Sequence, residues 1–249
     1  MATPPYAMPA GGLARLAPPS TSAYFLDVDG TLLEIRPQPG DVVSDEFLRA
    51  LLTKVRAAAD GALALVSGRK IDDLDRIFAP IVLPAAGLHG AEIRFADGSR
   101  IAAEDGVMDA ARPKLREFAA AHPGLILEDK GATLALHFRQ RPELEAKVLA
   151  ALQPFAENPD LAVQPGKMVA ELKQVAHTKA TAIAALLASP PFIGRRPVFI
   201  GDDLTDEGGF AFVNERGGIS ARIGAPQAAT EARFWLSDPA QLRKELEEL

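Results

Sequence analysis

The sequence contains no cysteine. That absence excludes disulfide bonds, thiolate metal sites and a cysteine nucleophile. It is typical of a protein that works in a reducing compartment, and we expect a cytoplasmic protein. Aromatic residues are also scarce, at 6% of the 249 residues, and their positions indicate no aromatic cage.

An excess of positive charge is absent as well. Lys and Arg number 27 against 33 Asp and Glu, which gives a net charge of −6. Because nucleic acids and anionic membranes bind basic surfaces, we expect neither as a partner. No apolar run approaches the roughly 18–20 residues of a membrane span, and the most apolar stretch, residues 77–88, is broken by Pro80 and Pro84. We expect a small molecule as the partner, and a monomer.

The N-terminal segment lacks a continuous run of apolar residues. Residues 1–19 hold five prolines and a single charge, Arg15. Pro and Gly interrupt the continuous apolar core that a signal peptide needs. We predict that residues 1–21 form a flexible, extended segment and that the folded protein begins near Ser22.

The composition of the chain is that of a globular protein, with 48% hydrophobic and 24% charged residues. Residues 23–78 alternate short apolar runs with segments of helical spacing: strand 23–29, helix 45–59, strand 62–66 and helix 71–78. Strand, helix, strand, helix predicts a parallel sheet with right-handed crossovers. The same pattern returns with a helix at 178–188 and a strand at 197–200.

The middle of the chain differs. It holds two helical segments and four short strands, the last two around Pro165-Gly166, which predicts an α+β unit with both helices on one face of an antiparallel sheet. We therefore predict an α/β fold: a Rossmann-like parallel-sheet core made of residues 22–104 and 174–249, with an inserted α+β cap domain at residues 105–173.

Polar segments come directly after three predicted core strands. They are Asp27-Val-Asp29-Gly30-Thr31, Ser67-Gly-Arg69 and Gly201-Asp202-Asp203. In open parallel sheets ligands bind beyond the carboxyl ends of the strands, so these segments should converge. One Asp-x-Asp is commonly just a turn or a helix cap. Several carboxylates at one edge, however, repel one another unless a cation lies among them, and an oxygen-coordinated ion such as Mg²⁺ fits.

Two sets of motifs carry a resemblance to known proteins. The first set is Asp27-Val-Asp-Gly-Thr-Leu32, Ser67, Lys179 and Gly201-Asp-Asp-Leu-Thr-Asp206. The second is Gly87-Leu-His-Gly-Ala-Glu92, Glu128-Asp-Lys130, Pro165-Gly-Lys-Met-Val-Ala-Glu171 and Gly201-Asp-Asp-Leu-Thr-Asp-Glu207. The first set resembles the haloacid-dehalogenase-like (HAD) phosphatases. The second resembles, more narrowly, the trehalose-6-phosphate phosphatase family, over nearly the whole chain from Ser22.

The resemblance implies a Mg²⁺-dependent phosphatase that releases phosphate from trehalose 6-phosphate through an aspartyl-phosphate. Asp27 would be the nucleophile and Asp29 the acid and base. The Asp27 carboxylate, the Asp29 backbone carbonyl and Asp202 would hold the metal. Asp203 and Asp206 would be supporting carboxylates, with a helix N-cap as the alternative for Asp206.

The resemblance also implies contacts to the phosphate. Ser67 would donate a hydrogen bond to the phosphoryl group, and Lys179 would pair with Asp27 and the phosphate. The family usually has glycine after this lysine, and here Ala180 stands in that place, so Lys173 stays open as the alternative. Gly30 and Thr31 would offer a backbone N–H and a hydroxyl.

The roles of arginine and histidine are less direct. Arg69 either binds phosphate or forms a surface ion pair. His89 lies between two glycines, where substrate contact is more plausible than a place in the core. The other histidines, His122, His137 and His177, share no metal-ligand spacing, and we assign them no function.

The predicted cap domain carries mixed charges, namely Glu128, Lys130, Arg139, Lys167 and Glu171. Glu128 and Lys130 are two apart and share a face of a strand. Such residues are usually solvated ion pairs, but the resemblance makes them candidates for hydrogen bonds to sugar hydroxyls. Two alternatives stay open: a phosphatase for another sugar or polyol phosphate, and a non-catalytic phosphate-sensing domain. The phosphate-sensing alternative is disfavoured, because a domain that only binds phosphate does not require both Asp27 and Asp29.

Overall fold

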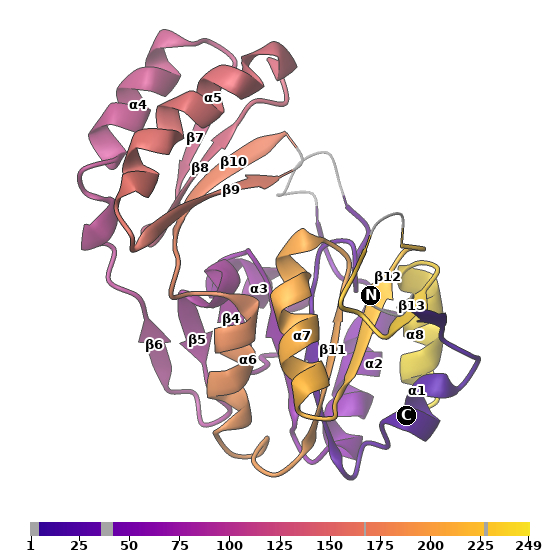
Figure 1. Ribbon diagram of the computed structural model, residues 1–249. Coiled ribbons are helices and arrows are strands. Elements are labelled where there is room, and N and C mark those ends of the chain that lie inside the picture. Colours follow the sequence, from indigo (N-terminus) through magenta and orange to yellow (C-terminus); the bar gives the residue numbers. More distant parts are fainter. Residues whose placement is uncertain (1–4, 36–41, 167, 227–228) are drawn as a thin grey trace. The chain divides into compact units, whose positions relative to one another are not determined.

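A computed structural model describes residues 5–35, 42–166, 168–226 and 229–249. The chain divides into two compact units (Figure 1). The core unit consists of Met1–Ile101 and Thr178–Leu249, and the inserted unit of Ala102–His177. The boundaries predicted from the sequence, 104/105 and 173/174, lie a few residues inside the inserted unit.

The core is an α/β structure built on a mostly parallel sheet, which confirms the predicted fold class. In sheet order the described strands are β1 (Tyr6–Ala7), β13 (Phe234–Leu236), β12 (Ile219–Ile223), β11 (Arg196–Gly201), β2 (Ser22–Leu26), β3 (Leu63–Val66), β4 (Ala85–Gly87), β5 (Glu92–Arg94) and β6 (Arg100–Ala102). All pairings from β1 to β4 are parallel, and β5 pairs antiparallel with β4.

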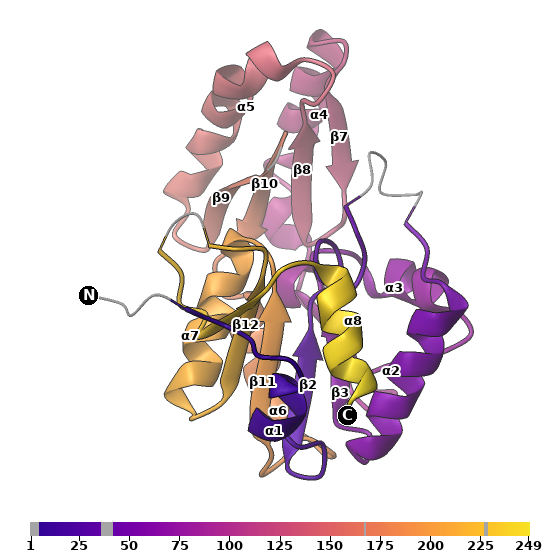
Figure 2. The ribbon, with the colours of Figure 1, turned by 90° about the vertical axis from the view of Figure 1, so that its right-hand side faces the viewer.

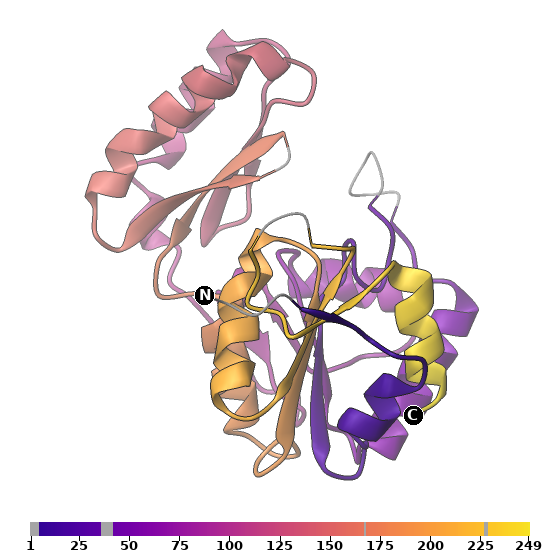
Figure 3. The ribbon, with the colours of Figure 1, turned by 45° about the vertical axis from the view of Figure 1, so that its right-hand side comes forward.

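Helices cover both faces of this sheet (Figures 1 and 3). Helices α6 (Lys179–Leu187) and α7 (Glu207–Glu215) lie on one face, and α1 (Gly12–Leu16), α2 (Glu46–Ala58), α3 (Ile71–Phe78) and α8 (Pro239–Glu247) on the other. Helices α2 and α8 pack side by side (Figure 2). Because the central strands are covered twice, all five residues of β2 are buried. This double burial is why β2 and β3 read as uninterrupted apolar runs in the sequence.

The inserted unit is a four-stranded antiparallel sheet with two helices on one face (Figure 1). Its elements are β7 (Ile126–Asp129), β8 (Thr133–His137), β10 (Val169–Gln174), β9 (Leu161–Gly166), α4 (Arg112–Ala121) and α5 (Glu145–Leu152). The apolar residues of β8 and β10 pack against α4 and α5 in a second core, which contains Leu134, Leu136, Leu172, Leu115 and Val148. The unit thus has an apolar face under its helices and an opposite, polar face.

The prediction of a flexible segment over residues 1–21 is wrong for the part that the structure describes. Tyr6 and Ala7 form β1, which pairs with β13, and α1 comes next in the chain. Leu13 is fully buried in the core. The Glu245 carboxylate accepts hydrogen bonds from the backbone N–H groups of Gly11 at 3.0 Å and Leu13 at 2.9 Å. The contacts that order this segment come from the far end of the chain, so its proline-rich sequence does not reveal them.

Among the residues that the structure describes, every helix is too short or too polar to cross a lipid bilayer.

The packing of α1 yields a first prediction. Leu13→Ala should lower the free energy of unfolding by about 2–5 kcal/mol, because it opens a cavity in a filled core. Arg15→Ala, on the exposed side of the same helix, should change it by less than about 0.5 kcal/mol. Urea unfolding of both variants checks this. A Leu13→Ala protein as stable as the Arg15→Ala control would show that the N-terminal segment does not contribute to the core.

Candidate active site

Four neighbouring parallel strands end at one edge of the core sheet, and polar residues come after each of them. Asp27 follows β2, Ser67 follows β3, the turn holding His89 follows β4, and Asp202 follows β11. The strands lie in the order β11, β2, β3, β4. Carboxyl ends of adjacent parallel strands form the usual binding edge of an open α/β sheet. The structure therefore brings the three polar segments of the sequence to one edge.

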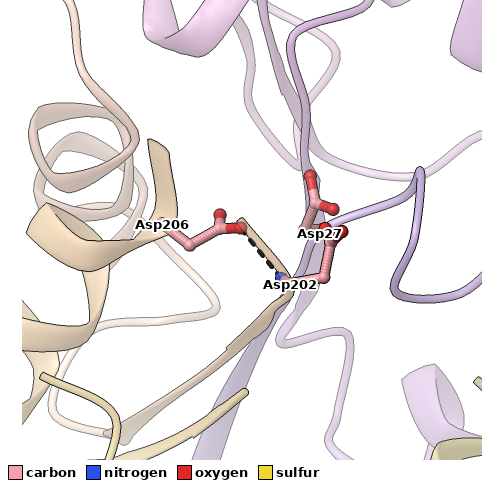
Figure 4. A group of neighbouring side chains, drawn as sticks. All are labelled: Asp27, Asp202 and Asp206. Carbon is pink, nitrogen blue, oxygen red and sulfur yellow. Dashed lines mark hydrogen bonds between the residues drawn. The ribbon is translucent and has the colours of Figure 1, made fainter. Parts of the chain in front are cut away.

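Three carboxylates come together at this edge (Figure 4). Asp27, Asp202 and Asp206 each offer an oxygen, and these oxygens lie within 4.8 Å of one another. Asp27 is 4% exposed and Asp206 is fully buried. Asp206 precedes α7, but its Oδ2 accepts hydrogen bonds from the backbone N–H groups of Asp202 and Asp203, both at 3.0 Å. Its carboxylate therefore braces the loop after β11 and does not cap α7.

Asp203 differs from its neighbours. Its Oδ1 accepts hydrogen bonds from the backbone N–H of Thr205 at 2.7 Å and from the Thr205 hydroxyl at 2.6 Å. The sequence predicts a supporting role for both Asp203 and Asp206. The structure places Asp206 among the clustered carboxylates and gives Asp203 a local capping role in the turn.

Lys179 bridges two of the carboxylates from the first turn of α6. Its Nζ lies 2.8 Å from Asp27 Oδ1 and 2.6 Å from Asp206 Oδ1, and its side chain is 4% exposed. Thr178 fixes the start of the helix, because its Oγ1 accepts a hydrogen bond from the Thr181 N–H. The alternative residue, Lys173, lies on β10 of the inserted unit. Lys179 thus makes the contact with Asp27 that the family resemblance implies, although the next residue is Ala180.

The charges at this edge do not balance. Burial raises the pKa of Asp27 well above its usual range, and Asp206 and Asp202 add to that effect against the pull of Lys179. Burial, with Asp203 and Asp206, raises the pKa of Asp202 from its ordinary 3.8 to about 7. For Lys179, burial alone would lower the pKa, but Asp206 and Asp27 outweigh it and raise the pKa. One ammonium faces several carboxylates, and a divalent cation among these hard oxygen donors would stabilise the ionised forms.

Two glycines make room for the carboxylates. Gly30 has φ +82°, and a Cβ there would lie 2.1 Å from Asp202 Oδ2. A Cβ on Gly201 would lie 2.3 Å from Asp206 Cγ. The sequence predicts that the Gly30 N–H binds phosphate, but in the structure it donates to the Leu33 carbonyl at 2.7 Å. Gly30 therefore leaves space for the Asp202 side chain, and its positive φ allows the chain to turn at this point.

Asp29 and Arg69 form a two-pronged ion pair at the same edge. Arg69 Nε lies 2.6 Å from Asp29 Oδ2, and Nη2 lies 2.7 Å from Oδ1. The Arg69 side chain is 12% exposed and that of Asp29 35%. Of the two roles left open for Arg69, the structure shows an ion pair, and its partner is the predicted acid and base of the site.

The remaining predicted phosphate contacts lie beside this pair. Ser67 is 1% exposed, and its Oγ accepts the Arg69 N–H at 3.2 Å. The Thr31 hydroxyl lies 3.4 Å from Asp202 Oδ1. His89 packs over the Ser67-Gly68 turn, because a Cβ on Gly68 would lie 2.6 Å from its Nε2. All three side chains are grouped at the carboxyl edge.

The polar face of the inserted unit holds the second predicted group. Glu128 on β7 and Glu171 on β10 are both in register with Ala135 on the strand between them. Lys130 Nζ lies 3.8 Å from Glu128 Oε2 and 3.4 Å from Glu171 Oε1. The structure brings these three residues together. Arg139 is exposed just beyond β8, and Lys167 lies outside the described residues.

Two residues of this face are not among those predicted from the sequence. His137 Nε2 lies 2.9 Å from Glu128 Oε2, and the Thr133 hydroxyl donates to Glu171 Oε1 at 2.9 Å. Both alternate with the apolar residues Leu134 and Leu136 along β8. That alternation is a signal in the sequence, because it places them on the polar face.

Comparisons with known proteins identify one family of similar sequences. The trehalose-phosphatase family model matches residues 25–240. The chain is 44% identical over 218 residues to the trehalose-6-phosphate phosphatase of Escherichia coli strain K12, covering 86% of this chain and 81% of that protein. It is 45% identical over 213 residues to a probable trehalose-phosphate phosphatase of Sinorhizobium fredii, covering 84% of this chain and 80% of that one.

Solved structures share the fold. A trehalose-6-phosphate phosphatase related protein is 26% identical with a TM-score of 0.72, covering 91% of this chain and 96% of that one. The C-terminal domain of the C. albicans trehalose-6-phosphate phosphatase has a TM-score of 0.83 at 19% identity, covering 98% and 97%. A Bacteroides thetaiotaomicron phosphatase of the HAD superfamily has a TM-score of 0.61 at 20% identity, covering 92% and 95%. At identities this low, the last two show the fold alone.

The raised pKa of Asp202 predicts how metal binding depends on pH. The folded protein retains a proton on Asp202 up to about pH 7, whereas the unfolded chain loses it near 3.8. The contribution of Asp202 to the stability of the metal-free protein is therefore lost as the pH rises from about 4 to 7. A divalent cation must displace that proton, so it should raise the Tm more at pH 8 than at pH 6.

Thermal unfolding of chelator-treated protein, with and without added divalent cation, measures this difference. Asp202→Asn should abolish most of it. A Tm increase of the same size at both pH values, and in the Asn variant, would contradict the assignment of Asp202 to the cation.

Proposed function

The chain belongs to the trehalose-phosphatase family, and on that premise we propose that it hydrolyses trehalose 6-phosphate to trehalose and inorganic phosphate. The observation that carries the proposal is the buried Asp27, paired with Lys179 and flanked by Asp202 and Asp206 at the carboxyl edge of the sheet. A nucleophilic carboxylate beside a fixed ammonium and a cation site is what attack on a phosphate dianion requires.

Asp27 is the nucleophile in this proposal. Lys179 donates to its Oδ1 at 2.8 Å, which orients the carboxylate and leaves Oδ2 as the attacking oxygen. A bond forms from Oδ2 to phosphorus, and the bond from phosphorus to the sugar oxygen breaks. Water then attacks the aspartyl-phosphate, which releases phosphate and restores the carboxylate.

Asp29 moves the protons. In its protonated form, with one of its two hydrogen bonds to Arg69 open, it donates a proton to the departing sugar oxygen, and the resulting carboxylate accepts one from the attacking water. Arg69 holds the Asp29 carboxylate at the edge where both steps take place. Ser67 and Thr31 supply hydroxyl groups to the phosphoryl oxygens.

Mg²⁺ is the proposed cofactor, held by the carboxylates of Asp27 and Asp202 and by the backbone carbonyl of Asp29. When bound, it neutralises negative charge on the phosphoryl group. Asp206 is already engaged by Lys179 and by two backbone N–H groups, so it supports the cation site from outside.

The inserted unit recognises the sugar in this proposal, as a cap domain does. Glu128, Lys130 and Glu171 form one charged group on its polar face, and a disaccharide offers many hydroxyl partners for such charges. Arg139, Lys167 and, in the core unit, His89 complete the proposed sugar and phosphate contacts. Action as a monomer in the cytoplasm is also part of the proposal.

A panel of phosphorylated sugars tests the substrate directly. Phosphate release from trehalose 6-phosphate should exceed release from sucrose phosphate or glucosylglycerol phosphate by at least about tenfold in kcat/KM. It should stop in excess chelator and return with Mg²⁺. Faster hydrolysis of another sugar phosphate would show that trehalose 6-phosphate is not the substrate. Full activity in chelator would contradict the requirement for a metal.

Replacing the nucleophile separates chemistry from folding. Asp27→Asn keeps the size of the side chain but removes the attacking charge, so turnover should fall by at least about 10³-fold. The Tm should stay near that of the wild type, because Lys179 keeps its ion pair with Asp206. Phosphate release and thermal unfolding measure the two effects. More than a few per cent residual activity would rule out covalent catalysis by Asp27.

Replacing the charged group separates recognition from chemistry. Glu128→Ala, Lys130→Ala and Glu171→Ala each remove a charged hydrogen bond to the sugar, worth about 1.5–3 kcal/mol. That corresponds to a loss of about 10- to 150-fold in kcat/KM on trehalose 6-phosphate. A small aryl phosphate has no sugar to recognise and should lose far less. Equal losses on both substrates would show that these residues support the fold instead.

A further inference from the structure

The polar face of the inserted unit contains a strand that no sugar contact has been assigned to. Strand β8 lies between β7, which carries Glu128, and β10, which carries Glu171. Its residue in register with both glutamates is Ala135, whose side chain is a single methyl group. The residues two positions before and after it on the same face are Thr133 and His137, and each is hydrogen-bonded to one of the glutamates.

The two hydrogen bonds from the central strand β8 hold the carboxylates of Glu128 and Glu171. A carboxylate only accepts, so His137 must carry a proton on Nε2 where it lies 2.9 Å from Glu128 Oε2. This hydrogen bond and the charge of Lys130 lower the pKa of Glu128 against the effect of burial, which keeps it ionised. The Thr133 hydroxyl donates to Glu171 Oε1 at 2.9 Å, and both of these residues are buried.

Strand β8 is anchored on its apolar side. Leu134, Leu136 and Phe138 alternate with the polar residues and are buried at 0%, 0% and 2% exposure in the second core. Thr133 and His137 therefore lie on a strand whose other face packs in the second core with α4 and α5. Binding groups held by donors on a rigid strand keep their geometry without a large cost in conformational entropy.

The His137–Glu128 pair adds little to the stability of the fold. Its side chains are 31% and 45% exposed. Ion pairs and hydrogen bonds at that exposure have small effects on unfolding. His137 therefore contributes little to stability, yet it is hydrogen-bonded to Glu128 of the charged group. This combination indicates that His137 orients the Glu128 carboxylate.

We propose that His137 and Thr133 are positioning residues for sugar recognition, holding Glu128 and Glu171 at the separation set by Ala135. The inference rests on the proposed function, because it gives the two glutamates the task of binding the disaccharide. Each carboxylate has about four acceptor positions, and the hydrogen bond to β8 takes one of them. Without the β8 donor the carboxylate samples other rotamers, and substrate binding must then order it again at a cost in conformational entropy.

The test compares matched variants that differ in one donor. His137→Leu removes the N–H and His137→Gln restores an amide N–H; Thr133→Val removes the hydroxyl at constant shape and Thr133→Ser restores it. The readout is kcat/KM on trehalose 6-phosphate divided by kcat/KM on an aryl phosphate. His137→Leu and Thr133→Val should lower this ratio about 3- to 10-fold, mainly through KM, and the Gln and Ser variants should recover most of it.

A double-mutant comparison checks that each residue acts through its glutamate. In a Glu128→Ala protein, His137→Leu should lower the ratio by less than about twofold more, and Thr133→Val should behave likewise in Glu171→Ala. Additive losses would overturn the inference, as would equal losses on both substrates accompanied by a lower Tm.

The outcomes also separate this inference from the proposed function. If Glu128→Ala and Glu171→Ala lower the ratio while His137→Leu and Thr133→Val do not, the positioning role is wrong and the sugar-binding role of the glutamates stands. If none of the four lowers the ratio, the two glutamates do not bind the sugar, and the positioning role falls with that part of the proposed function.

Discussion

The buried ammonium of Lys179 connects the parts of the site. It joins Asp27, which follows β2, to Asp206, which follows β11. Lys179 is the second residue of the segment that returns from the inserted unit, and its contact with Asp27 joins the two chain segments of the core unit at the site. Removing one partner of a buried ion pair typically costs about 3–5 kcal/mol, because the other charge is left without compensation. Lys179 therefore serves the fold through Asp206 and the proposed chemistry through Asp27.

This arrangement places three carboxylates beside a single buried ammonium. Asp27 and Asp206 share one lysine, while Asp202 retains a raised pKa of about 7. A hydrophobic replacement would avoid burying these carboxylates but would also remove the charges that the proposed phosphoryl transfer uses. The same logic explains Gly30 and Gly201, since any side chain at either position would push a carboxylate away from the edge.

Much of this could be predicted from the sequence, because burial and spacing are local signals. The uninterrupted apolar strands predicted the parallel sheet, and the helix predicted at 71–78 matches α3. The polar residues after the strands predicted which side chains meet at the edge. The errors concern contacts between distant residues: Glu245 orders Gly11 and Leu13, and Leu33 occupies the Gly30 N–H. His137 has no metal-ligand spacing and so received no predicted function, although its place in the alternation of β8 puts it beside Glu128.

The order of strands in the core sheet has a consequence for how the chain is made. Strand β2 lies between β3, which comes soon after it in the sequence, and β11, which is synthesised only after the whole inserted unit. Until then one edge of β2 has unpaired backbone N–H and C=O groups. Strand β1 waits even longer, because its partner β13 is close to the C-terminus. The inserted unit has its own apolar core, so it has the means to fold during that interval while the site is incomplete. On the ribosome, the candidate active site is therefore among the last parts of the molecule to be assembled.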